Sequence, residues 1–309
     1  MPDQLKPPII LFGNFRSGTT MLQKLIASHP DVVRLNEPVS LWLYADPRRR
    51  HDEFDAADAT PRVKRYIRGE FLGFQQENGN RIIAEKTPHN ILRIPYVREV
   101  FPEAHFLYLV RNPLSFISSV DLKWQKPATS RRLLKRLRMT PATQLHHYLG
   151  QFLNQQWNNR ILGRKYLSVW GPRYKGIEED LKVEDRLTVM ARQWARASAK
   201  AERDLAGFED GRVLRLQYED FVEHPVEHLR RICAHCGLQI TREMEETART
   251  TVKTDRKLKW QRFDRDDLAR IIPELRQEME RHGYEVPTQI ADVPKLSIPA
   301  VEEVAGLAG

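Results

Sequence analysis

The residues best suited to bind an anion lie in a glycine-framed loop near the start of the chain. An apolar run from Ile9 to Phe12 leads into the sequence Gly13-Asn14-Phe15-Arg16-Ser17-Gly18-Thr19-Thr20. A strand, a glycine-rich turn and a helix in this order present backbone N–H groups to a phosphate at the helix start. The spacing matches the phosphate-binding loop of nucleotide kinases, except that Thr19 stands where those proteins have a lysine.

The missing lysine limits the kind of ligand that this loop is expected to bind. In nucleoside triphosphatases the lysine reaches the β- and γ-phosphates, and a neighbouring serine or threonine holds Mg²⁺. Arg16 is the cation inside the present loop. A ligand with one terminal anionic group and no magnesium therefore fits better than ATP.

A second anion-binding pattern follows a later strand. The run from His105 to Val110 reads as a buried strand, and Arg111 comes directly after it. Pro113 suits the first positions of a helix, which we predict over Leu114–Leu122. Ser119 lies eight residues after Arg111, and this separation places it about two turns along that helix. Both side chains can therefore converge on one phosphate.

In these features the chain resembles the sulfotransferases that use 3′-phosphoadenosine 5′-phosphosulfate (PAPS). The family's 5′-phosphosulfate loop is similar to residues 16–20, and its 3′-phosphate signature, an arginine followed eight residues later by a serine, is similar to Arg111 and Ser119. The likeness extends from about Ile9 to Tyr284. Its further matches are Glu85-Lys86-Thr87-Pro88, Tyr218-Glu219-Asp220, Lys259-Trp260 and His282-Gly283-Tyr284.

The resemblance implies a set of donor-binding residues and no metal ion. The residues implied to bind PAPS are Arg16, Ser17, Gly18, Thr19, Thr20, Arg111, Ser119, Tyr218 and Lys259. Arg16 and Lys86 are further implied to contact the transferring sulfuryl group and the bridging oxygen that leaves with the nucleotide.

The same resemblance implies Glu37 as the general base. The chain is most similar to the bacterial, tyrosylprotein and carbohydrate sulfotransferases, which have arginine in the loop, and Glu37 resembles the glutamate base of the tyrosylprotein and heparan branches. The small-molecule branch has a Lys-Thr-His motif instead, whereas this chain reads Lys86-Thr87-Pro88-His89. His89 is therefore the alternative base, although it is one residue out of register. The alternative for Glu37 is a structural role, either as a surface carboxylate or as an ion-pair partner of Arg16.

The implied reaction is an in-line attack of a hydroxyl or amine on the sulfur of PAPS, with 3′,5′-diphosphoadenosine (PAP) leaving. A carbohydrate is the favoured acceptor by family analogy, and a lipid-linked glycan, a peptide tyrosine and a small phenol remain open. Two other classes compete with this hypothesis. One is a P-loop kinase, which needs ATP and magnesium, and the other is a catalytically inactive module that binds a nucleotide or glycan.

The elements that position these residues alternate along the chain. The predicted strands are Ile9–Phe12, Ile82–Ala84, Phe106–Val110 and Val213–Leu216, and the predicted helices are Thr19–Ser28, Asn90–Phe101 and Leu114–Leu122. Such alternation predicts an α/β fold of the P-loop type, in which a parallel sheet lies between two layers of helices. Ligands of these sheets bind outside the carboxyl ends of the strands. The glycine loop, Lys86, Arg111 and Tyr218 all fall there.

A single domain is expected over residues 1–285 of the 309-residue chain. Within it, residues 123–192 read as a helical insertion over the acceptor site, with helices predicted near Gln144–Asn159 and Glu184–Ala206. The tail, residues 286–309, has little to bury and is expected to be loose.

The net charge of +9 suits an anionic donor through electrostatic steering. No zinc-finger spacing or RNA-recognition signature accompanies it, so we expect no nucleic-acid partner. The basic run at residues 131–138 carries apolar residues at helical spacing. A solvated amphipathic helix is the favoured interpretation, and peripheral contact with a membrane or glycan is the alternative.

No run is apolar and long enough for a transmembrane helix, and the chain reaches its first strand by Ile9, so we expect a cytoplasmic protein. Cys233 and Cys236 form a Cys-x-x-Cys pair. Because this pair closes a helix predicted over His228–Gly237, whereas a redox pair opens one, we expect it to be structural.

Overall fold

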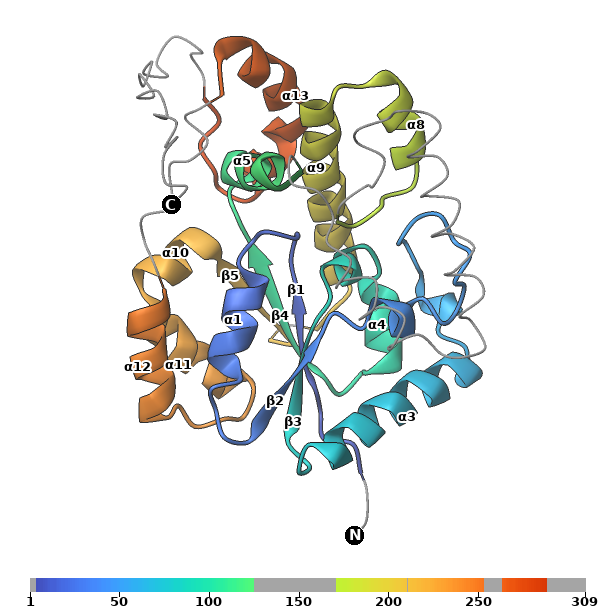
Figure 1. Cartoon of the computed structure of the whole chain (residues 1–309), viewed down its shortest axis with the longest axis vertical. Coiled ribbons are helices and arrows are strands. Elements are labelled where there is room, and N and C mark those ends of the chain that lie inside the picture. Colours follow the sequence, from blue (N-terminus) through green and yellow to red (C-terminus); the bar gives the residue numbers. More distant parts are fainter. Residues whose placement is uncertain (1–3, 125–170, 210, 253–262, 288–309) are drawn as a thin grey trace, which may run out of the picture.

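The computed structural model describes residues 4–124, 171–209, 211–252 and 263–287, and its centre is a five-stranded parallel sheet (Figure 1). The strand order is β2-β3-β1-β4-β5. The strands are β1 Ile9–Phe12, β2 Val32–Asn36, β3 Ile82–Lys86, β4 His105–Val110 and β5 Val213–Gln217. The glycine loop thus leaves the sheet from its central strand, between the ends of β3 and β4.

Helices cover both faces of the sheet, as Figure 1 shows. On one face, Ile9 and Leu11 of β1 pack against α1, α10, α11 and α12, and on the other face, Ile10 and Phe12 pack toward α3, α4, α9 and α13. The first set is α1 Thr19–Ile26, α10 Tyr218–Glu223, α11 Pro225–His235 and α12 Arg242–Thr251. The second set is α3 Pro61–Glu77, α4 Ile94–Val100, α9 Arg186–Leu205 and α13 Arg265–Arg281. The predicted three-layer α/β fold is confirmed.

Five further helical segments complete the described fold. They are α2 Val39–Trp42, the 3₁₀ turns η1 Ala56–Asp58 and η2 Pro88–Leu92, α5 Pro113–Trp124, and α8 Ile177–Val183. The single helix predicted over residues 90–101 is wrong, because η2 and α4 are separate. Arg93 (φ −143°, ψ 36°) interrupts the helical path, and Pro95 in the first turn of α4 starts a new helix.

Strand β2 and helix α3 are additions to the elements predicted from the sequence. Thr60 caps α3 by accepting a hydrogen bond from the Val63 backbone N–H at 3.4 Å. Val63, Ile67 and Phe71 follow at helical spacing and are buried on one face. These signals could have identified α3 in the sequence.

Several sequence predictions lie outside the described residues. They concern the basic run at 131–138, the helix near 144–159, Lys259 with Trp260, and the tail from residue 288 on. The helix predicted over Glu184–Ala206 is confirmed as α9, whose N-cap Asp185 accepts hydrogen bonds from the backbone N–H groups of Leu187 and Thr188. The assignment of 1–285 to one domain stays a prediction.

The cysteine pair lies at the end of α11, in the core that this helix forms with the sheet. Cys233 and Cys236 are free thiols and both are buried. Burial raises the pKa of Cys233 to about 11 and, together with the neighbouring Cys233, that of Cys236 to about 12. Thiols so protonated at neutral pH are poor nucleophiles, as expected for residues that serve packing.

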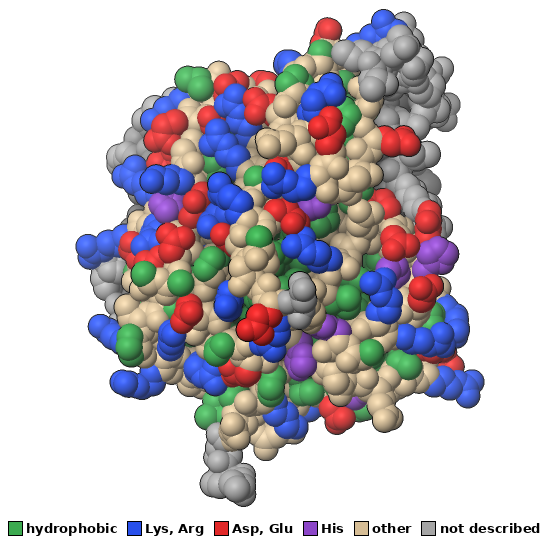
Figure 2. Space-filling model, turned by 180° about the vertical axis from the view of Figure 1, so that it is seen from behind, with side chains coloured by type: hydrophobic (Ala, Val, Ile, Leu, Met, Phe, Trp, Pro, Cys, Tyr) green, Lys and Arg blue, Asp and Glu red, His purple; other side chains and the backbone are tan. Residues whose placement is uncertain are grey.

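On the face opposite to that of Figure 1, the charged side chains of the described residues are of mixed sign. Figure 2 shows Lys and Arg side chains interspersed with Asp and Glu over the face opposite to that of Figure 1. No helix among the described residues is long and apolar enough to span a membrane.

Candidate active site

The glycine loop is shaped by backbone conformations that few residues adopt. Gly13, Arg16 and Gly18 have φ values of 156°, 66° and 92°. The Asn14 carbonyl accepts a hydrogen bond from the Ser17 N–H at 3.1 Å, and the Asn14 side-chain Nδ2 donates to Ser198 Oγ of α9 at 3.0 Å. The loop therefore ends at α1 in a fixed conformation. The first N–H groups of that helix have no partner within the helix and can bind an anion.

Gly18 is also required by its close approach to Tyr218. A Cβ atom at Gly18 would lie 2.6 Å from the Tyr218 ring. The first residue after β5 is thereby in contact with the glycine loop, which follows β1. The structure brings together two of the expected donor-binding residues that are far apart in the sequence.

Replacing Gly18 by alanine should destabilise the protein by about 2–5 kcal/mol, because left-handed backbone strain adds to overpacking against Tyr218. Gly79→Ala is the matched control, since Gly79 also has a positive φ of 71°, but a Cβ added there would meet no described atom within 4 Å. The control should lose only about 1–2 kcal/mol. Urea unfolding monitored by circular dichroism measures both, and equal losses would contradict the steric argument.

Arg111 and Ser119 meet the glycine loop on the same side as Tyr218. The Arg111 Nη1 donates to the Arg16 carbonyl at 2.8 Å, and the Arg16 Nε donates to Ser119 Oγ at 3.1 Å. The Arg111 guanidinium also lies 4.3 Å from the centre of the Tyr218 ring, a cation–π contact. Four of the expected donor-binding side chains thus form one cluster, and Arg16 reaches the serine that the resemblance assigns to the 3′-phosphate.

Glu219 anchors the turn that carries Arg111, a role that the sequence analysis did not assign. Its Oε1 accepts a hydrogen bond from the Asn112 N–H at 3.1 Å, and its Oε2 accepts one from the Tyr284 hydroxyl at 3.1 Å. Burial and the adjacent Glu219 raise the pKa of Tyr284, so its hydroxyl stays protonated and can donate. Two of the segments that resemble the sulfotransferases therefore meet at the turn that carries Arg111. They are Tyr218-Glu219-Asp220 and His282-Gly283-Tyr284.

On the opposite side of the loop, Lys86 and Glu37 form an ion pair. Lys86 is the last residue of β3, and its Nζ donates to Glu37 Oε1. The lysine side chain is 1% exposed and the glutamate side chain 46% exposed. A buried ammonium needs such a partner, and the Glu37 side chain is itself partly open to solvent.

Glu37 is placed by strand pairing. In the β2–β3 register Asn36 lies opposite Lys86, so the next residue, Glu37, turns across the end of β3. Its N–H donates to the Lys86 carbonyl at 3.1 Å, and its φ is 53°, in the left-handed region that glutamate seldom adopts. Backbone strain of this kind is concentrated at functional sites.

His89, the alternative base, lies in η2 close to a buried aspartate. Burial raises the pKa of Asp52, but His89, Arg173 and Arg93 outweigh this effect and lower it to about 2. Asp52 also binds Arg173, whose Nη2 donates to Oδ1 at 3.0 Å. No sequence signal pointed to Asp52, whose carboxylate gives His89 a negatively charged neighbour in the core.

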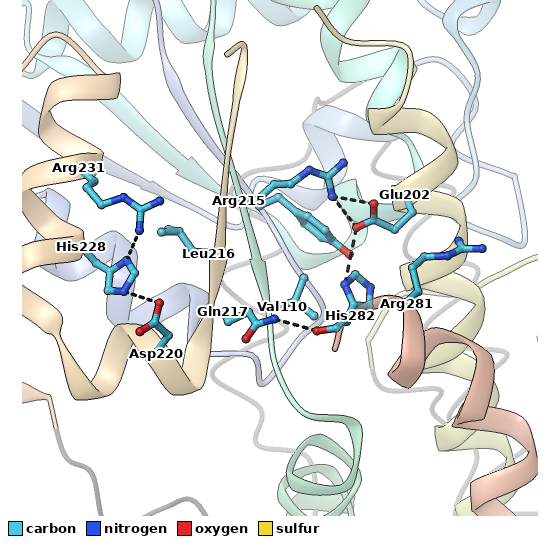
Figure 3. A pocket seen from close by; sticks show the side chains of 11 residues that line it. Val110, Glu202, Arg215, Leu216, Gln217, Asp220, His228, Arg231, Arg281 and His282 are labelled. Atoms are coloured by element: carbon cyan, nitrogen blue, oxygen red, sulfur yellow. Dashed lines mark hydrogen bonds and ion pairs between the residues drawn. The ribbon is translucent and has the colours of Figure 1, made fainter. Parts of the chain in front are cut away.

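A hollow of about 340 Å³ lies beside β5, next to the candidate site (Figure 3). Figure 3 shows Arg215 from β5 directed to Glu202 of α9, and His228 of α11 directed to Asp220. Val110 and Gln217, the residues directly before Arg111 and Tyr218, also line it. The hollow thus lies next to the residues that carry Arg111 and Tyr218. Most of the charged side chains that line the hollow are paired with one another.

The described residues therefore offer two adjoining kinds of chemistry. The glycine loop with Arg16, Arg111 and Ser119 can bind a doubly anionic ligand. Next to it, Glu37 can accept a proton and Lys86 can stabilise developing negative charge. An arrangement of this type suits the transfer of an anionic group to a nucleophile.

Comparison with known proteins gives a family match over most of the chain. A family model described as "Sulfotransferase family" matches residues 7–169 and 160–243. Among curated proteins, nodulation protein NoeE of Sinorhizobium fredii (strain NBRC 101917 / NGR234) is 28% identical over 142 residues. That alignment covers 40% of this chain and 34% of NoeE, so it spans about a third of the relative's length.

Solved structures share the fold. The sulfotransferase domain from the curacin biosynthetic pathway has a TM-score of 0.56 at 15% identity, covering 92% of this chain and 100% of that domain. The sulfotransferase domain from the Synechococcus PCC 7002 olefin synthase has a TM-score of 0.54 at 15% identity, covering 92% and 97%. At these identities the likeness concerns the fold alone.

Proposed function

Because this chain belongs to the sulfotransferase family, we propose that it transfers the sulfuryl group of PAPS to a hydroxyl or amine acceptor, with a carbohydrate hydroxyl as the favoured acceptor. The observation that carries the proposal is the Glu37–Lys86 pair, which lies at the carboxyl edge of the sheet beside the anion-binding loop. A proton acceptor and a cation in contact are the two groups that such a transfer needs.

The proposed step assigns one role to each member of the pair. The acceptor oxygen bonds to sulfur while the bond from sulfur to the bridging oxygen breaks, and the acceptor's proton passes to the Glu37 carboxylate. The electron pair of the broken bond stays on the bridging oxygen, which leaves as part of PAP. Lys86, together with Arg16, stabilises the charge on that oxygen.

The ion pair also suggests how the site prepares for the reaction. The Lys86 ammonium pairs with the Glu37 carboxylate. A phosphosulfate in the glycine loop would offer Lys86 a second anionic partner. As the lysine turns toward the bridging oxygen, the carboxylate is released to accept a proton.

The donor-binding residues fit a nucleotide with two separate anionic groups. We assign residues 16–20 to the 5′-phosphosulfate, and Arg111 and Ser119 to the 3′-phosphate. The Arg16–Ser119 hydrogen bond supports this assignment, because it joins the two groups of side chains into one continuous surface. Tyr218 holds the Arg111 guanidinium from its ring face.

Arg111→Ala should weaken PAP binding by about 1.5–3 kcal/mol, the usual contribution of a hydrogen bond to a charged group. Binding of adenosine 5′-phosphosulfate should barely change, because that nucleotide lacks the 3′-phosphate. Calorimetric titration measures both affinities, and Arg242→Ala, which removes a highly exposed arginine of α12, is the control. Equal losses for the two nucleotides would show that Arg111 serves the fold or another part of the ligand.

Two measurements test the proposed function against its alternatives. Thermal protection by PAP without magnesium supports a sulfotransferase, whereas protection by Mg-ATP alone supports a kinase. Transfer of labelled sulfate from PAPS into an extract of the host, followed by identification of the product, then tests turnover and the acceptor class. A protein that binds PAP but labels nothing would be an inactive binding module, and a labelled peptide or phenol would overturn the carbohydrate assignment.

A further inference from the structure

One buried carboxyl group next to Lys86 has no part in the proposed chemistry. Glu85 precedes Lys86 in β3, and its whole residue is 0% exposed. Strand alternation directs its side chain to the face opposite that of Lys86, into the core that contains α3, α4 and α9. Glu85 therefore cannot touch donor or acceptor, and any effect on the reaction must pass through other residues.

The partners of Glu85 belong to the two segments that border the Glu37–Lys86 pair. Its Oε1 accepts a hydrogen bond from Trp42 Nε1 at 3.1 Å, and its Oε2 accepts one from Asn90 Nδ2 at 3.3 Å. Trp42 ends α2, the helix that begins directly after Glu37 and Pro38. Asn90 lies in η2, the turn that follows Lys86.

Helix α2 is consequently attached to the end of β3 at both of its ends. At the first end, the Glu37 N–H donates to the Lys86 carbonyl at 3.1 Å. At the second end, the Trp42 indole donates to Glu85. Two consecutive residues of β3 thus fix the segment that carries the proposed base.

Trp42 is well suited to transmit this restraint. It is 0% exposed, and its ring packs edge-on against Phe71, Tyr96 and Phe101, with ring centres 5.9–6.2 Å apart. A large ring held on several sides cannot easily change its rotamer. Trp42 therefore moves together with α2, and its indole hydrogen bond ties both to Glu85.

From this geometry we infer that Glu85 is a positioning residue: its carboxyl group holds α2 and η2 around the end of β3 and so keeps Glu37 and Lys86 in register with each other. This inference rests on the proposed function only where it is tested by a change in kcat. The restraint on the positions of Glu37 and Lys86 holds whether or not the protein transfers sulfate.

The charge of Glu85 is not needed for this role. Burial raises the pKa of Glu85 to about 7, although Thr87, Trp42, Lys86 and Arg93 act against it. The carboxyl group is therefore protonated more readily near neutral pH than an exposed glutamate is. A neutral amide of the same shape can accept from Trp42, and Asn90 can rotate its own amide to offer Oδ1, which has no hydrogen-bond partner among the described residues, to the new donor.

The test compares Glu85→Ala with the conservative Glu85→Gln. Glu85→Ala should lower kcat by about 10- to 100-fold, the usual result of displacing catalytic groups by a fraction of an ångström to one ångström, while the Kd for PAP changes less than about threefold. Glu85→Gln should restore kcat to within about threefold of the unaltered protein. Glu99→Ala, which removes a half-exposed carboxylate from neighbouring α4, is the matched control and should leave kcat unchanged.

A second readout does not depend on transferase activity. Acetic anhydride should acylate the buried Lys86 slowly in the unaltered protein, and several-fold faster in Glu85→Ala, relative to the exposed Lys182 measured in the same digest by mass spectrometry. Glu85→Gln should react at the original rate. If the unaltered protein transfers no sulfate but Lys86 reactivity follows this pattern, the proposed function falls while the positioning role stands.

Trp42→Phe keeps the inference testable if Glu85→Ala does not fold. It removes the indole N–H and leaves Glu85 in place. Like Glu85→Ala, it should therefore lower kcat and accelerate acylation of Lys86. Unchanged kcat per folded molecule in either variant would overturn the inference. A loss that Glu85→Gln does not restore would do so as well, because it would assign the effect to the charge.

Discussion

Replacing Glu37 by glutamine is expected to lower the turnover number by about 10²–10⁴-fold, the usual contribution of a positioned general base. The amide keeps the length of the side chain but cannot accept the acceptor's proton. The affinity for PAP should stay within a few-fold, because the nucleotide does not require that proton acceptor. Steady-state transfer of labelled sulfate and calorimetric titration with PAP give the two quantities.

His89→Asn is the control for this experiment, since His89 is the other candidate base. The structure gives His89 the buried Asp52 as a charged neighbour, and we expect its variant to retain most of the turnover. Near-normal turnover in Glu37→Gln together with its loss in His89→Asn would transfer the role of base to the histidine. If both variants remained active, another group would have to take the proton.

Lys86→Met is expected to lower turnover by about 10²–10³-fold, the scale found when one donor to a developing negative charge is removed. Methionine is similar in length and suits a side chain that is 1% exposed. The fold should tolerate the change, because Glu37 is 46% exposed and water can solvate its unpaired carboxylate. Single-turnover transfer rates at saturating PAPS separate the chemical step from binding.

Lys64→Met provides the comparison for Lys86. Lys64 also pairs with a glutamate, Glu99, but is 35% exposed and lies in α3, away from the end of β3. It should transfer sulfate at the original rate. A Lys86→Met protein with normal single-turnover rates would exclude the lysine from charge stabilisation, and a parallel loss of PAP affinity would assign it to donor binding instead.

The central strands were predictable because helices cover both faces of the sheet, which requires apolar residues throughout each strand. β1 and β4 are covered on both faces, so they read as short apolar runs, and the bounds Ile9–Phe12 are the predicted ones. β2 lies at the edge of the sheet, and Val33, Arg34 and Asn36 are only partly buried. Its sequence therefore lacks the continuous apolar run that identifies a buried parallel strand.

The candidate site was predictable where a residue directly follows a recognised strand. Arg111 and Tyr218 are of this kind, and parallel strands bring their carboxyl ends to one edge. Glu37 was nominated by resemblance alone. Its contact with Lys86 follows from the pairing of β2 with β3, which the sequence analysis did not include.

The buried charges were not predictable at all. Aspartate, glutamate and arginine are usually exposed, so Asp52, Glu85 and Arg93 read as surface residues until the structure supplies their partners. Asp52 and its partner Arg173 are 121 residues apart in the chain. No local pattern connects residues at such a separation.

The strand order has a consequence for how this fold can be recombined. Glu37 and Lys86 follow β2 and β3, whereas Arg111 and Tyr218 follow β4 and β5, on the other side of β1. Because β2 and β3 are consecutive in the chain, the first group lies within one uninterrupted stretch between α1 and β4. Exchanging that stretch for the matching stretch of another sulfotransferase would replace the proposed base Glu37 and its surroundings with two crossovers. The residues proposed to bind the nucleotide after β4 and β5 would still come from this chain.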